Sequence, residues 1–183
     1  MGRPKALLRH CANDTSFVAH AIGQARAAGL DAIFVVGREN DDELRAEVAR
    51  EQGTFVVNPD PERGQLSSLL AGVDAADHPD LTALIVMPVD VPLVSARVMR
   101  KLLERAAASE LSIVRAVHRG RHGHPVLFKR EVFDELKAAD PDLGAKMVVR
   151  ADPRRVLDVE VDEPGVTSDV DTPEDYERLF RRR

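Results

Sequence analysis

Short runs of apolar residues alternate along the chain with longer segments in which apolar residues recur every three or four positions. The short runs are typical of strands in a buried sheet, and the longer segments are typical of helices with one buried face. This alternation predicts βαβ units on a mainly parallel sheet. The predicted strands are 32–36, 54–57, 82–87, 111–117, 125–128 and 156–161. The predicted helices are 15–28, 41–51, 66–76, 95–108, 131–138, 143–150 and 173–180.

Burial and helix ends can also be predicted from this pattern. The run at 82–87 is uncharged, so we expect a strand that is buried on both faces, and we expect 32–36 to be buried as well. Asp14 or Thr15 is expected to cap the first helix and Gly29 to end it, while Asn40 is expected to cap the second.

The composition is that of one folded domain, and we expect residues 1–183 to form it. Hydrophobic residues make up 44% and charged residues 31% of the 183 residues, the mixture of a globular protein. The net charge of -5 argues against a nucleic-acid-binding face, which is usually basic. No apolar run approaches the roughly 20 residues of a membrane-spanning helix, and the single cysteine, Cys11, suits a reducing compartment. We therefore expect a cytoplasmic protein with no nucleic-acid or membrane partner.

The first candidate for chemistry is Asp90, in the segment MPVDVPLV at 87–94. Ligands of open parallel sheets bind beyond the carboxyl ends of strands, and this aspartate follows the most apolar strand. Pro88 and Pro92 stiffen the turn, which would hold the carboxylate rigidly enough to share a Mg2+ ion with phosphate and water. The alternative is an ordinary turn aspartate between two prolines.

A second acidic cluster, SDVDTPED at 168–175, precedes the last helix. Asp171 or Thr172 suits the N-cap position, and acidic residues in a first helical turn need no further function. If this loop and the Asp90 turn face the same edge of the sheet, however, two distant carboxylates would form a magnesium clamp.

Features that suit an anion or a nucleotide follow the 54–57 strand, in NPDPERGQLSSLLAG at 58–72. A loop with Gly64 leads into a helix whose first turns carry Ser67 and Ser68. Amides at a helix N-terminus attract anions, and hydroxyl and amide side chains, including that of Asn58, can contact a base edge or a sugar. An ordinary loop and helix cap is the alternative.

Two further segments have the composition of ligand-binding loops. RHGHPVLF at 121–128 combines Gly123, which lets another backbone approach closely, with His124, which can donate to an oxyanion; a polar hairpin is the alternative. A transition-metal site is not favoured, because no cysteine or third carboxylate accompanies these histidines. Near the start, Lys5 follows a glycine-containing loop and can neutralise phosphate, although the chain lacks the GxxxxGK[ST] pattern.

Six segments, in this order, resemble the MobA-like nucleotidyltransferases, and most of all the branch that transfers cytidylyl groups to molybdopterin. They are GRPKALL, NPDPERGQLSSLLAG, MPVDVPL, GHPVLF, LGAKMVV and SDVDTPEDYERL. GHPVLF and the SSL element favour the cytidylyl branch over the guanylyl branch. The resemblance covers essentially the whole chain. It implies an α/β, Rossmann-like fold of the nucleotide-diphospho-sugar-transferase type, a three-layer sandwich around a mixed, mostly parallel sheet.

The resemblance also implies an activity and a cofactor, Mg2+. A phosphate of the molybdopterin-type acceptor would attack the α-phosphorus of CTP, with GTP as the alternative, and pyrophosphate would leave. Asp90 and Asp171 would hold Mg2+, with Asp169 as the second choice for the latter, and Lys5 and Asp90 would be the catalytic residues. The nucleotide-binding residues would be Lys5, Asn58, Gly64, Ser67, Ser68 and Asp90, and the acceptor-binding residues Gly123, His124 and Pro125.

The sequence differs from the family at its N-terminus. The family begins with a buried strand and a glycine-rich loop of the form LAAGxSxRMGxPK, whereas this sequence starts at the Met of that pattern. We expect the strand to be missing from the middle of the sheet and the loop to be missing around the triphosphate. A start codon assigned too late is favoured over a degenerate copy as the explanation.

Two other functions fit the same residues. The chain could be a catalytically silent, nucleotide-binding assembly partner of a molybdoenzyme or its chaperone. It could also be a nucleotidyltransferase for a sugar or alcohol phosphate, because the same metal-binding aspartates would serve another acceptor.

Overall fold

A four-stranded sheet forms the centre of the chain, in the order β5 (Ala83–Val86), β7 (Arg121–Lys129), β6 (Ile113–His118) and β8 (Val156–Glu160). It belongs to a computed structural model that describes residues 4–10, 14–140 and 144–180. β6 and β8 are parallel, while β7 runs antiparallel to both β5 and β6. β7 returns from β6 through a tight turn at Arg119 and Gly120, which both have positive φ, as hairpin turns of this kind require. This hairpin makes the sheet mixed.

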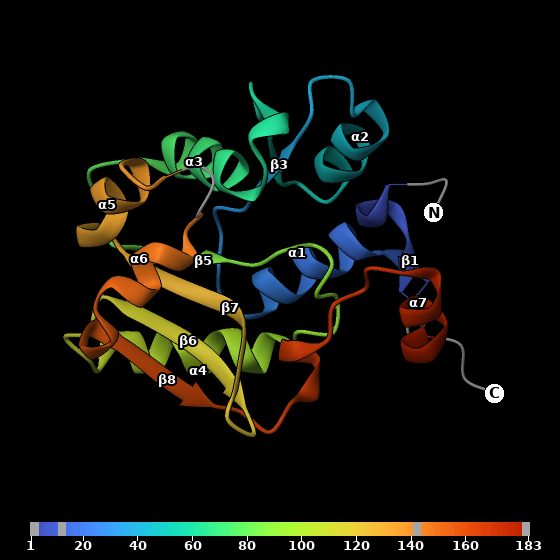
Figure 1. Cartoon of the computed structure of the whole chain (residues 1–183). Coiled ribbons are helices and arrows are strands. Elements are labelled where there is room, and N and C mark those ends of the chain that lie inside the picture. The colour runs from blue at the N-terminus through green and yellow to red at the C-terminus, as the bar shows by residue number, and fades with distance from the viewer. Residues whose placement is uncertain (1–3, 11–13, 141–143, 181–183) are drawn as a thin grey trace.

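Helices cover both faces of this sheet, so the chain has three layers (Figure 1). One face packs against α1 (Phe17–Ala27) and α4 (Ala96–Ala107). The other packs against α3 (Gln65–Ala76), α5 (Phe133–Lys137) and α6 (Lys146–Ala151). The predicted three-layer α/β class is confirmed.

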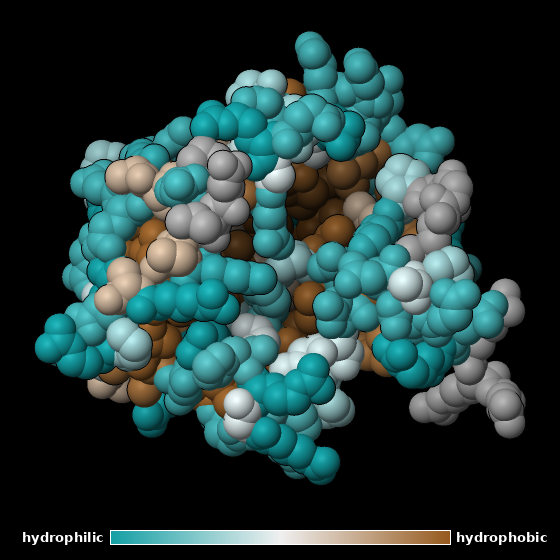
Figure 2. Space-filling model, viewed as in Figure 1, coloured by the Kyte–Doolittle hydropathy of each residue, from teal (hydrophilic) through white to brown (hydrophobic). Residues whose placement is uncertain are grey.

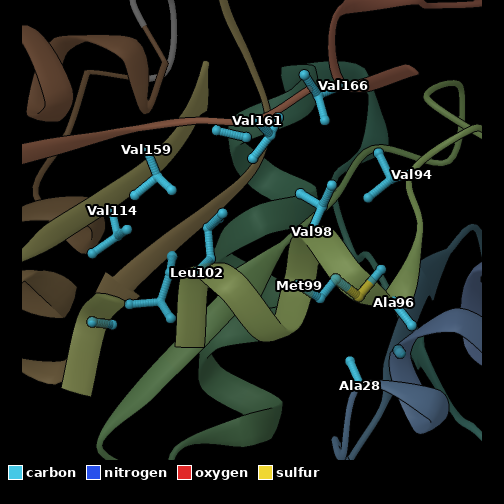
Figure 3. Close-up of a cluster of buried hydrophobic side chains, with 14 of the residues drawn as sticks. Ala28, Val94, Ala96, Val98, Met99, Leu102, Val114, Val159, Val161 and Val166 are labelled. Carbon is cyan, nitrogen blue, oxygen red and sulfur yellow. The ribbon is translucent and has the colours of Figure 1, made fainter. Parts of the chain in front are cut away.

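The alternation of side chains along each strand divides the core between the two faces. Val114 and Ala116 of β6 enter the cluster beneath α4, whereas Ile113 enters the cluster beneath α3 and α5. Figure 3 shows the first cluster, in which Val98, Met99 and Leu102 of α4 meet residues of the sheet.

β3 (Phe34–Gly37) and β4 (Thr54–Val57) form a separate parallel pair, joined by α2 (Asp42–Arg50). Among the described residues, neither strand is hydrogen-bonded to the four-stranded sheet. The prediction that 32–36 and 82–87 form fully buried strands is wrong, since all residues of β3 and β5 are only half-buried. The physical reason is that, within residues 4–10, 14–140 and 144–180, each of these strands is paired with one strand instead of two. Figure 2 shows a hollow lined by hydrophobic residues in this region.

The first and the last described elements of the chain pack against α1. The short antiparallel strands β1 (Arg9–His10) and β2 (Thr15–Ser16), which the hydrophobic pattern did not predict, lead into α1. The last helix, α7 (Pro173–Phe180), packs its Phe180 against Phe17 of α1. Cys11 and Leu143, the residue where the 143–150 helix was expected to start, lie outside the described residues.

Two helix caps differ from those expected. Ser16 caps α1, because its hydroxyl accepts a hydrogen bond from the Ala19 amide at 3.1 Å, so neither Asp14 nor Thr15 does. α2 begins after Asp41 instead of Asn40. The end of α1 is as predicted, with Gly29 at a φ of 91° just beyond the last turn.

Candidate functional site

The turn after β5 holds the Asp90 side chain at the surface on a buried base. Val91, Pro92 and Val94 are buried, and the Val91 amide donates to the carbonyl oxygen of Pro88 at 3.2 Å. The side chain of Asp90 remains 32% exposed. The turn is therefore fixed by packing while its carboxylate stays accessible to a ligand.

The C-terminal segment is fastened to this turn by its backbone. The Val170 amide donates to the carbonyl oxygen of Asp90 at 2.8 Å, and the Val170 side chain is fully buried against Phe17 and Phe180. The segments around Asp90 and Asp171 therefore lie side by side, as two loops at one edge of the sheet.

A capping box at the start of α7 determines which acidic residue of the segment 168–175 is available to bind another group. The Thr172 hydroxyl accepts from the Asp175 amide at 3.1 Å, and the Asp175 carboxylate accepts from the Thr172 amide at 3.0 Å. Hydrogen bonding by Thr172 also holds the pKa of the Asp175 carboxyl below its usual range. Because this pair satisfies the helix start, the carboxylate of Asp171 does not cap α7 and can face Lys5.

Lys5 lies between the two carboxylates. Its Nζ atom is 2.6 Å from Oδ1 of Asp171 and 3.7 Å from Oδ2 of Asp90. Its backbone belongs to the 3-10 helix η1 (Lys5–Leu7), which is anchored by the buried side chains of Ala6 and Leu7. The hydrogen bond to Asp171, and then the charges of both carboxylates, raise the pKa of Lys5. The ammonium group is thus charged at neutral pH and is held by two carboxylates from distant parts of the chain.

This donor set fits a magnesium ion together with phosphate. Two carboxylates converge on one cation, and Mg2+ is usually held by one or two carboxylates while phosphates and water fill its other positions. Among the described residues no group of three or more His, Cys, Asp and Glu side chains has the arrangement of a metal site. The two aspartates would accordingly act together with a ligand that brings its own oxygen atoms.

Asn58 is buried at the end of β4 and organises the start of α3. Its Nδ2 donates to the hydroxyl oxygens of Ser67 at 2.9 Å and Ser68 at 3.0 Å, and its Oδ1 accepts from the Asp60 amide. The Ser67 hydroxyl in turn donates to the carbonyl oxygen of Gly64. Asn58 therefore positions the two serines, and its own amide group is already used within the protein.

Gly64 supplies the backbone conformation that starts α3. Its φ of 79° and ψ of -158° belong to a region that L side chains rarely adopt. No side chain caps this helix, and its first residues are exposed or half-buried apart from Leu66. The loop leaves the first amides of α3 accessible to an anion.

A cleft of about 410 Å3 lies at the carboxyl ends of β3 and β4. Its walls are Arg38, Glu39, Asn40, Asp41, Val57, Asn58, Pro59 and Pro61. The cleft residues that follow β3, at 38–41, were missed by the sequence-based predictions, although the rule that ligands bind beyond carboxyl ends applies to β3 as it does to β4. The cleft adjoins the loop that Asn58 and the two serines organise.

Gly123 makes a close approach, but to the protein itself. A Cβ atom at this position would lie 2.2 Å from the carbonyl oxygen of Val166, in the 3-10 helix η5 (Pro164–Thr167). Gly123 thus lets another backbone approach closely, as expected, and that backbone belongs to η5, so the glycine is needed for β7 to pack on η5; its contact with an acceptor stays a prediction. The segment 121–128 is part of a hairpin strand, which was the alternative considered for it, and Pro125 is buried within that strand.

His124 lies near the carboxylates with an unsatisfied ring nitrogen. Its Nδ1 is buried and has no hydrogen-bond partner among the described residues. Burial lowers the pKa of His124, while the charges of Asp90 and Asp169 act in the opposite direction. The neutral imidazole is thus favoured. Of the two candidate aspartates, Asp171 contacts Lys5, whereas the charge of Asp169 acts to raise the pKa of His124.

The other histidines of this hairpin are not grouped with His124. The His118 ring bonds to the carbonyl oxygen of Val161 at 2.8 Å, and the His122 ring lies 3.4 Å from Asp158. Each has a partner elsewhere, so a shared histidine metal site is not formed.

Within the part of the chain that the structure describes, no helix is both long and apolar enough to cross a membrane.

A family model described as the MobA-like NTP transferase domain matches residues 1–158. The chain is also 26% identical over 165 residues to the purine catabolism protein PucB of Bacillus subtilis (strain 168), a match that spans 86% of this chain and 79% of PucB.

Solved structures show the same architecture. The crystal structure of Rv0371c from Mycobacterium tuberculosis H37Rv matches with a TM-score of 0.84 and 30% identity, over 100% of this chain and 91% of that chain. Rv0371c has also been solved as a complex with manganese, which matches with a TM-score of 0.80 and 30% identity over 99% of this chain and 94% of that chain. Molybdopterin-guanine dinucleotide biosynthesis protein A from Archaeoglobus fulgidus is 16% identical, with a TM-score of 0.68 over 98% of this chain and 90% of that chain, and this likeness shows the fold alone.

Proposed function

Because the chain belongs to the MobA-like NTP transferase family, we propose that it transfers a nucleoside monophosphate from CTP to a phosphorylated acceptor of the molybdopterin type. GTP is the alternative donor. The observation that carries this proposal is the position of Lys5 between the carboxylates of Asp90 and Asp171. A lysine and two convergent carboxylates are what a triphosphate with a divalent cation requires.

In the proposed reaction an oxygen of the acceptor phosphate forms a bond to the α-phosphorus of the nucleotide, and the bond to the β-phosphate oxygen breaks. Pyrophosphate is the leaving group, and no covalent bond to the protein is needed. Transfers of this kind depend on in-line positioning and charge neutralisation. The side chains around Lys5 are suited to both tasks.

Each residue of the site has a role in this scheme. Asp90 and Asp171 would hold Mg2+, which supplies polarisation of the α-phosphate and charge neutralisation when it is bound. Lys5 would pass from the carboxylates to the triphosphate and neutralise its charge. The cleft at the ends of β3 and β4 would receive the nucleoside, beside the Ser67 and Ser68 hydroxyls.

His124 would contact the acceptor. Its orphaned Nδ1 atom would gain a hydrogen bond from or to the acceptor, according to the tautomer. Because burial keeps the ring neutral, His124 would bind the acceptor by hydrogen bonding and would not add a positive charge. Gly123 and Pro125 would support this contact by fixing β7 against η5.

Incubation of the protein with Mg2+, molybdopterin and each of the four nucleoside triphosphates tests the proposal. We expect pyrophosphate release and a nucleotide–molybdopterin product, detected by mass spectrometry, with CTP. Calorimetry with each triphosphate separates binding from turnover. Triphosphate binding without product for molybdopterin or for a panel of sugar and alcohol phosphates would indicate the silent assembly partner, and product with a different acceptor would overturn the molybdopterin assignment.

A further inference from the structure

The face of the four-stranded sheet that packs against α3, α5 and α6 changes character along its strands. Side chains on one face recur at every second residue, and Ile113, Val126 and Val156 enter the apolar cluster beneath these helices. Two residues further toward the β6–β7 hairpin, the same face carries polar side chains instead, those of Arg115, His124 and Asp158. The apolar layer therefore ends there, and a polar surface begins.

This polar half of the face is open to solvent. The side chain of Asp158 is 45% exposed and that of His122 is 58% exposed. In Figure 1, α4 lies behind β6 and β7, and no helix of the described chain lies in front of the strand ends near their hairpin. Figure 2 shows mainly hydrophilic residues in this region of the same view. A ligand can therefore reach the polar half of the sheet.

Arg115, Asp158 and His122 lie together on this open face, and we call them the sheet-face cluster. The Nε and Nη2 groups of Arg115 donate to the two carboxylate oxygens of Asp158 at 2.9 and 3.2 Å. Nε2 of His122 lies 3.4 Å from Oδ2 of Asp158. Because β6 is paired with β8 in a register that places Arg115 opposite Asp158, and with β7 on its other side, strand pairing itself assembles the cluster.

The sheet-face cluster has hydrogen-bonding capacity left for a ligand. A carboxylate has about four acceptor positions, and a guanidinium has more N–H donors than one carboxylate can use. The Asp158 oxygens can therefore accept from further donors, and the Nη1 group of Arg115 bonds to no protein atom in the described part of the chain. An acceptor and a donor thus lie side by side, in positions fixed by the strands.

The cluster adjoins the side chains that the proposed transfer uses. His122 and His124 are on the same face of β7, and two residues of an antiparallel strand span about 7 Å. The buried Nδ1 atom of His124 has no hydrogen-bond partner among the described residues, and the charge of Asp90 acts on this ring. One side of the sheet therefore leads from Asp90, past His124, to the sheet-face cluster.

The chemistry of the cluster specifies what can occupy it. A carboxylate beside a guanidinium complements a planar heterocycle that carries N–H groups next to a carbonyl oxygen. The two oxygens of Asp158 can accept from a ring N–H and an amino group on one edge of such a ring. A phosphate would gain from Arg115, but its charge would be repelled by the carboxylate of Asp158. The heterocycle is therefore the better match.

We propose that the sheet-face cluster binds the heterocyclic head of the acceptor, a planar lactam ring with an amino group beside its ring N–H. Asp158 accepts from the ring N–H and the amino group, and Arg115 donates to the carbonyl oxygen. The imidazole of His122 provides a flat surface at the edge of the ring. The phosphate arm extends along β7, past His124, toward Asp90. That the bound compound is an acceptor rests on the proposed transfer activity, whereas the binding itself does not.

Titration with pterin in the absence of nucleotide tests the cluster separately from the transfer reaction. Pterin carries the amino group, the ring N–H and the carbonyl oxygen on one edge. Lumazine is the matched ligand, in which a carbonyl oxygen replaces the amino group. Fluorescence of each heterocycle measures its affinity, and the chemical shifts of backbone amides, followed by NMR, locate the binding site.

We expect pterin to bind about tenfold more tightly than lumazine, the value of one charge-assisted hydrogen bond. Pterin should also shift the amide signals of Arg115, His122 and Asp158. Equal affinities of the two heterocycles would overturn the proposal, and so would shifts that are confined to residues outside the cluster and its strand neighbours.

Asp158→Asn tests the role of the carboxylate. The amide keeps one oxygen as an acceptor and replaces the other by a donor, so it should weaken the binding of pterin and strengthen that of lumazine. We expect the ratio of the two affinities to fall by about tenfold or more. Asp152→Asn is the matched control, because Asp152 also forms a bidentate pair, with Arg154, and should keep the wild-type ratio. An unchanged ratio in Asp158→Asn would overturn the proposal.

His122→Ala provides a second test, which holds even if Asp158→Asn fails to fold. The imidazole is 58% exposed, so its loss should leave the fold intact. Because stacking does not depend on which groups the ring edge carries, the affinities for pterin and for lumazine should both fall by about fivefold or more. Unchanged affinities for both heterocycles in this variant would count against the cluster.

The transfer assay separates this proposal from the proposed function. Binding of pterin at the cluster in a protein that forms no product would contradict the proposed function and leave the cluster assignment in place. Transfer to molybdopterin with the same KM for that acceptor in Asp158→Asn as in Asp152→Asn would overturn the assignment and leave the function in place.

Discussion

The backbone amide of Val170 donates a 2.8 Å hydrogen bond to the carbonyl oxygen of Asp90. This bond joins the turn after β5 to the segment before α7, and it brings the Asp90 and Asp171 carboxylates within reach of one lysine. The bond uses only main-chain atoms, so the side chains of the two aspartates can be changed without removing it. Substitutions at these positions therefore test chemistry with little effect on the fold.

Asp90→Asn is expected to lower nucleotidyl transfer by about 100-fold or more, because the amide cannot provide the same charge to a cation. The free energy of unfolding should change by less than about 1 kcal/mol, since the ion pair with Lys5 is exposed and at 3.7 Å. Pyrophosphate release and urea denaturation measure the two effects. A loss of several kcal/mol of stability would instead assign Asp90 a structural role.

Asp171→Asn and Asp169→Asn form a matched pair at the same loop. The carboxylate of Asp171 contacts Lys5, whereas the charge of Asp169 acts to raise the pKa of His124. We expect Asp171→Asn to weaken binding of Mn2+, measured by electron paramagnetic resonance with triphosphate present, by about tenfold or more. Asp169→Asn should leave Mn2+ binding near the wild-type value, and the reverse order would move the ligand role to Asp169.

Lys5→Met should have opposite effects on two ligands. Loss of the ammonium group leaves two neighbouring carboxylates without their cation, so Mn2+ alone should bind more tightly than to the wild type. Triphosphate should bind more weakly, by about tenfold. Calorimetry measures both, and Lys129→Met, at a lysine whose Nζ atom bonds to the carbonyl oxygen of Ser109, is a control. Parallel weakening of both ligands would show that Lys5 acts only as a structural support.

Much of the fold could be predicted because it depends on local periodicity. The strand at 54–57 and the helix at 173–180 were predicted with the bounds that the structure has, and the other predicted elements from residue 82 onward differ mainly at their ends. The start of β7 differed most: the strand begins at Arg121 instead of Pro125, because its first residues are polar and belong to a hairpin and so lack the apolar run that marks a strand. β1 and β2 were missed because two-residue strands have no periodicity.

The parts of the site that depend on contacts between distant segments were harder to predict from the sequence. The types of residue at Lys5, Asp90 and Asp171 indicated their chemistry, but the choice of Asp171 over Asp169 at the lysine follows from the capping box of Thr172 and Asp175. The role of Gly123 follows from η5, which is more than 40 positions away in the sequence. No local pattern contains that information.

Gly123→Ala is expected to destabilise the protein by about 2 kcal/mol or more, because the new methyl group would overlap the backbone of Val166. Gly23→Ala is the matched control, since this helical glycine has no neighbour within 4 Å of an added Cβ, and it should stabilise α1 by about 0.5–1 kcal/mol. Thermal and urea unfolding measure both. Equal stability of the two variants would contradict the close packing of β7 on η5.

The pair His10 and His20 predicts a dependence of stability on pH. The rings are stacked with centroids 4.0 Å apart, and burial, followed by the charge of His10, lowers the pKa of His20 to about 4. Since the unfolded value is 6.5, the unfolded chain binds more protons between these values. The stability from neutral His20 is therefore complete above pH 6.5 and declines as the pH falls toward 4.

His20→Gln should reduce this decline in the free energy of unfolding, measured by urea denaturation at pH 7 and pH 5. His78→Gln is the control, because that histidine is 71% exposed. A wild-type decline that persists in His20→Gln would assign the pH dependence to other groups.

The hydrogen bond between Lys5 and Asp171 joins residues 166 positions apart in the sequence. A polypeptide that stops near the end of β8, at Glu160, contains all the strands of the central sheet but lacks one of the two carboxylates. Such a chain could bury most of its apolar residues and still have no cation-binding pair. The pair of carboxylates thus forms only when the polypeptide extends to Asp171, so cation binding depends on this C-terminal segment, whereas formation of the central sheet does not.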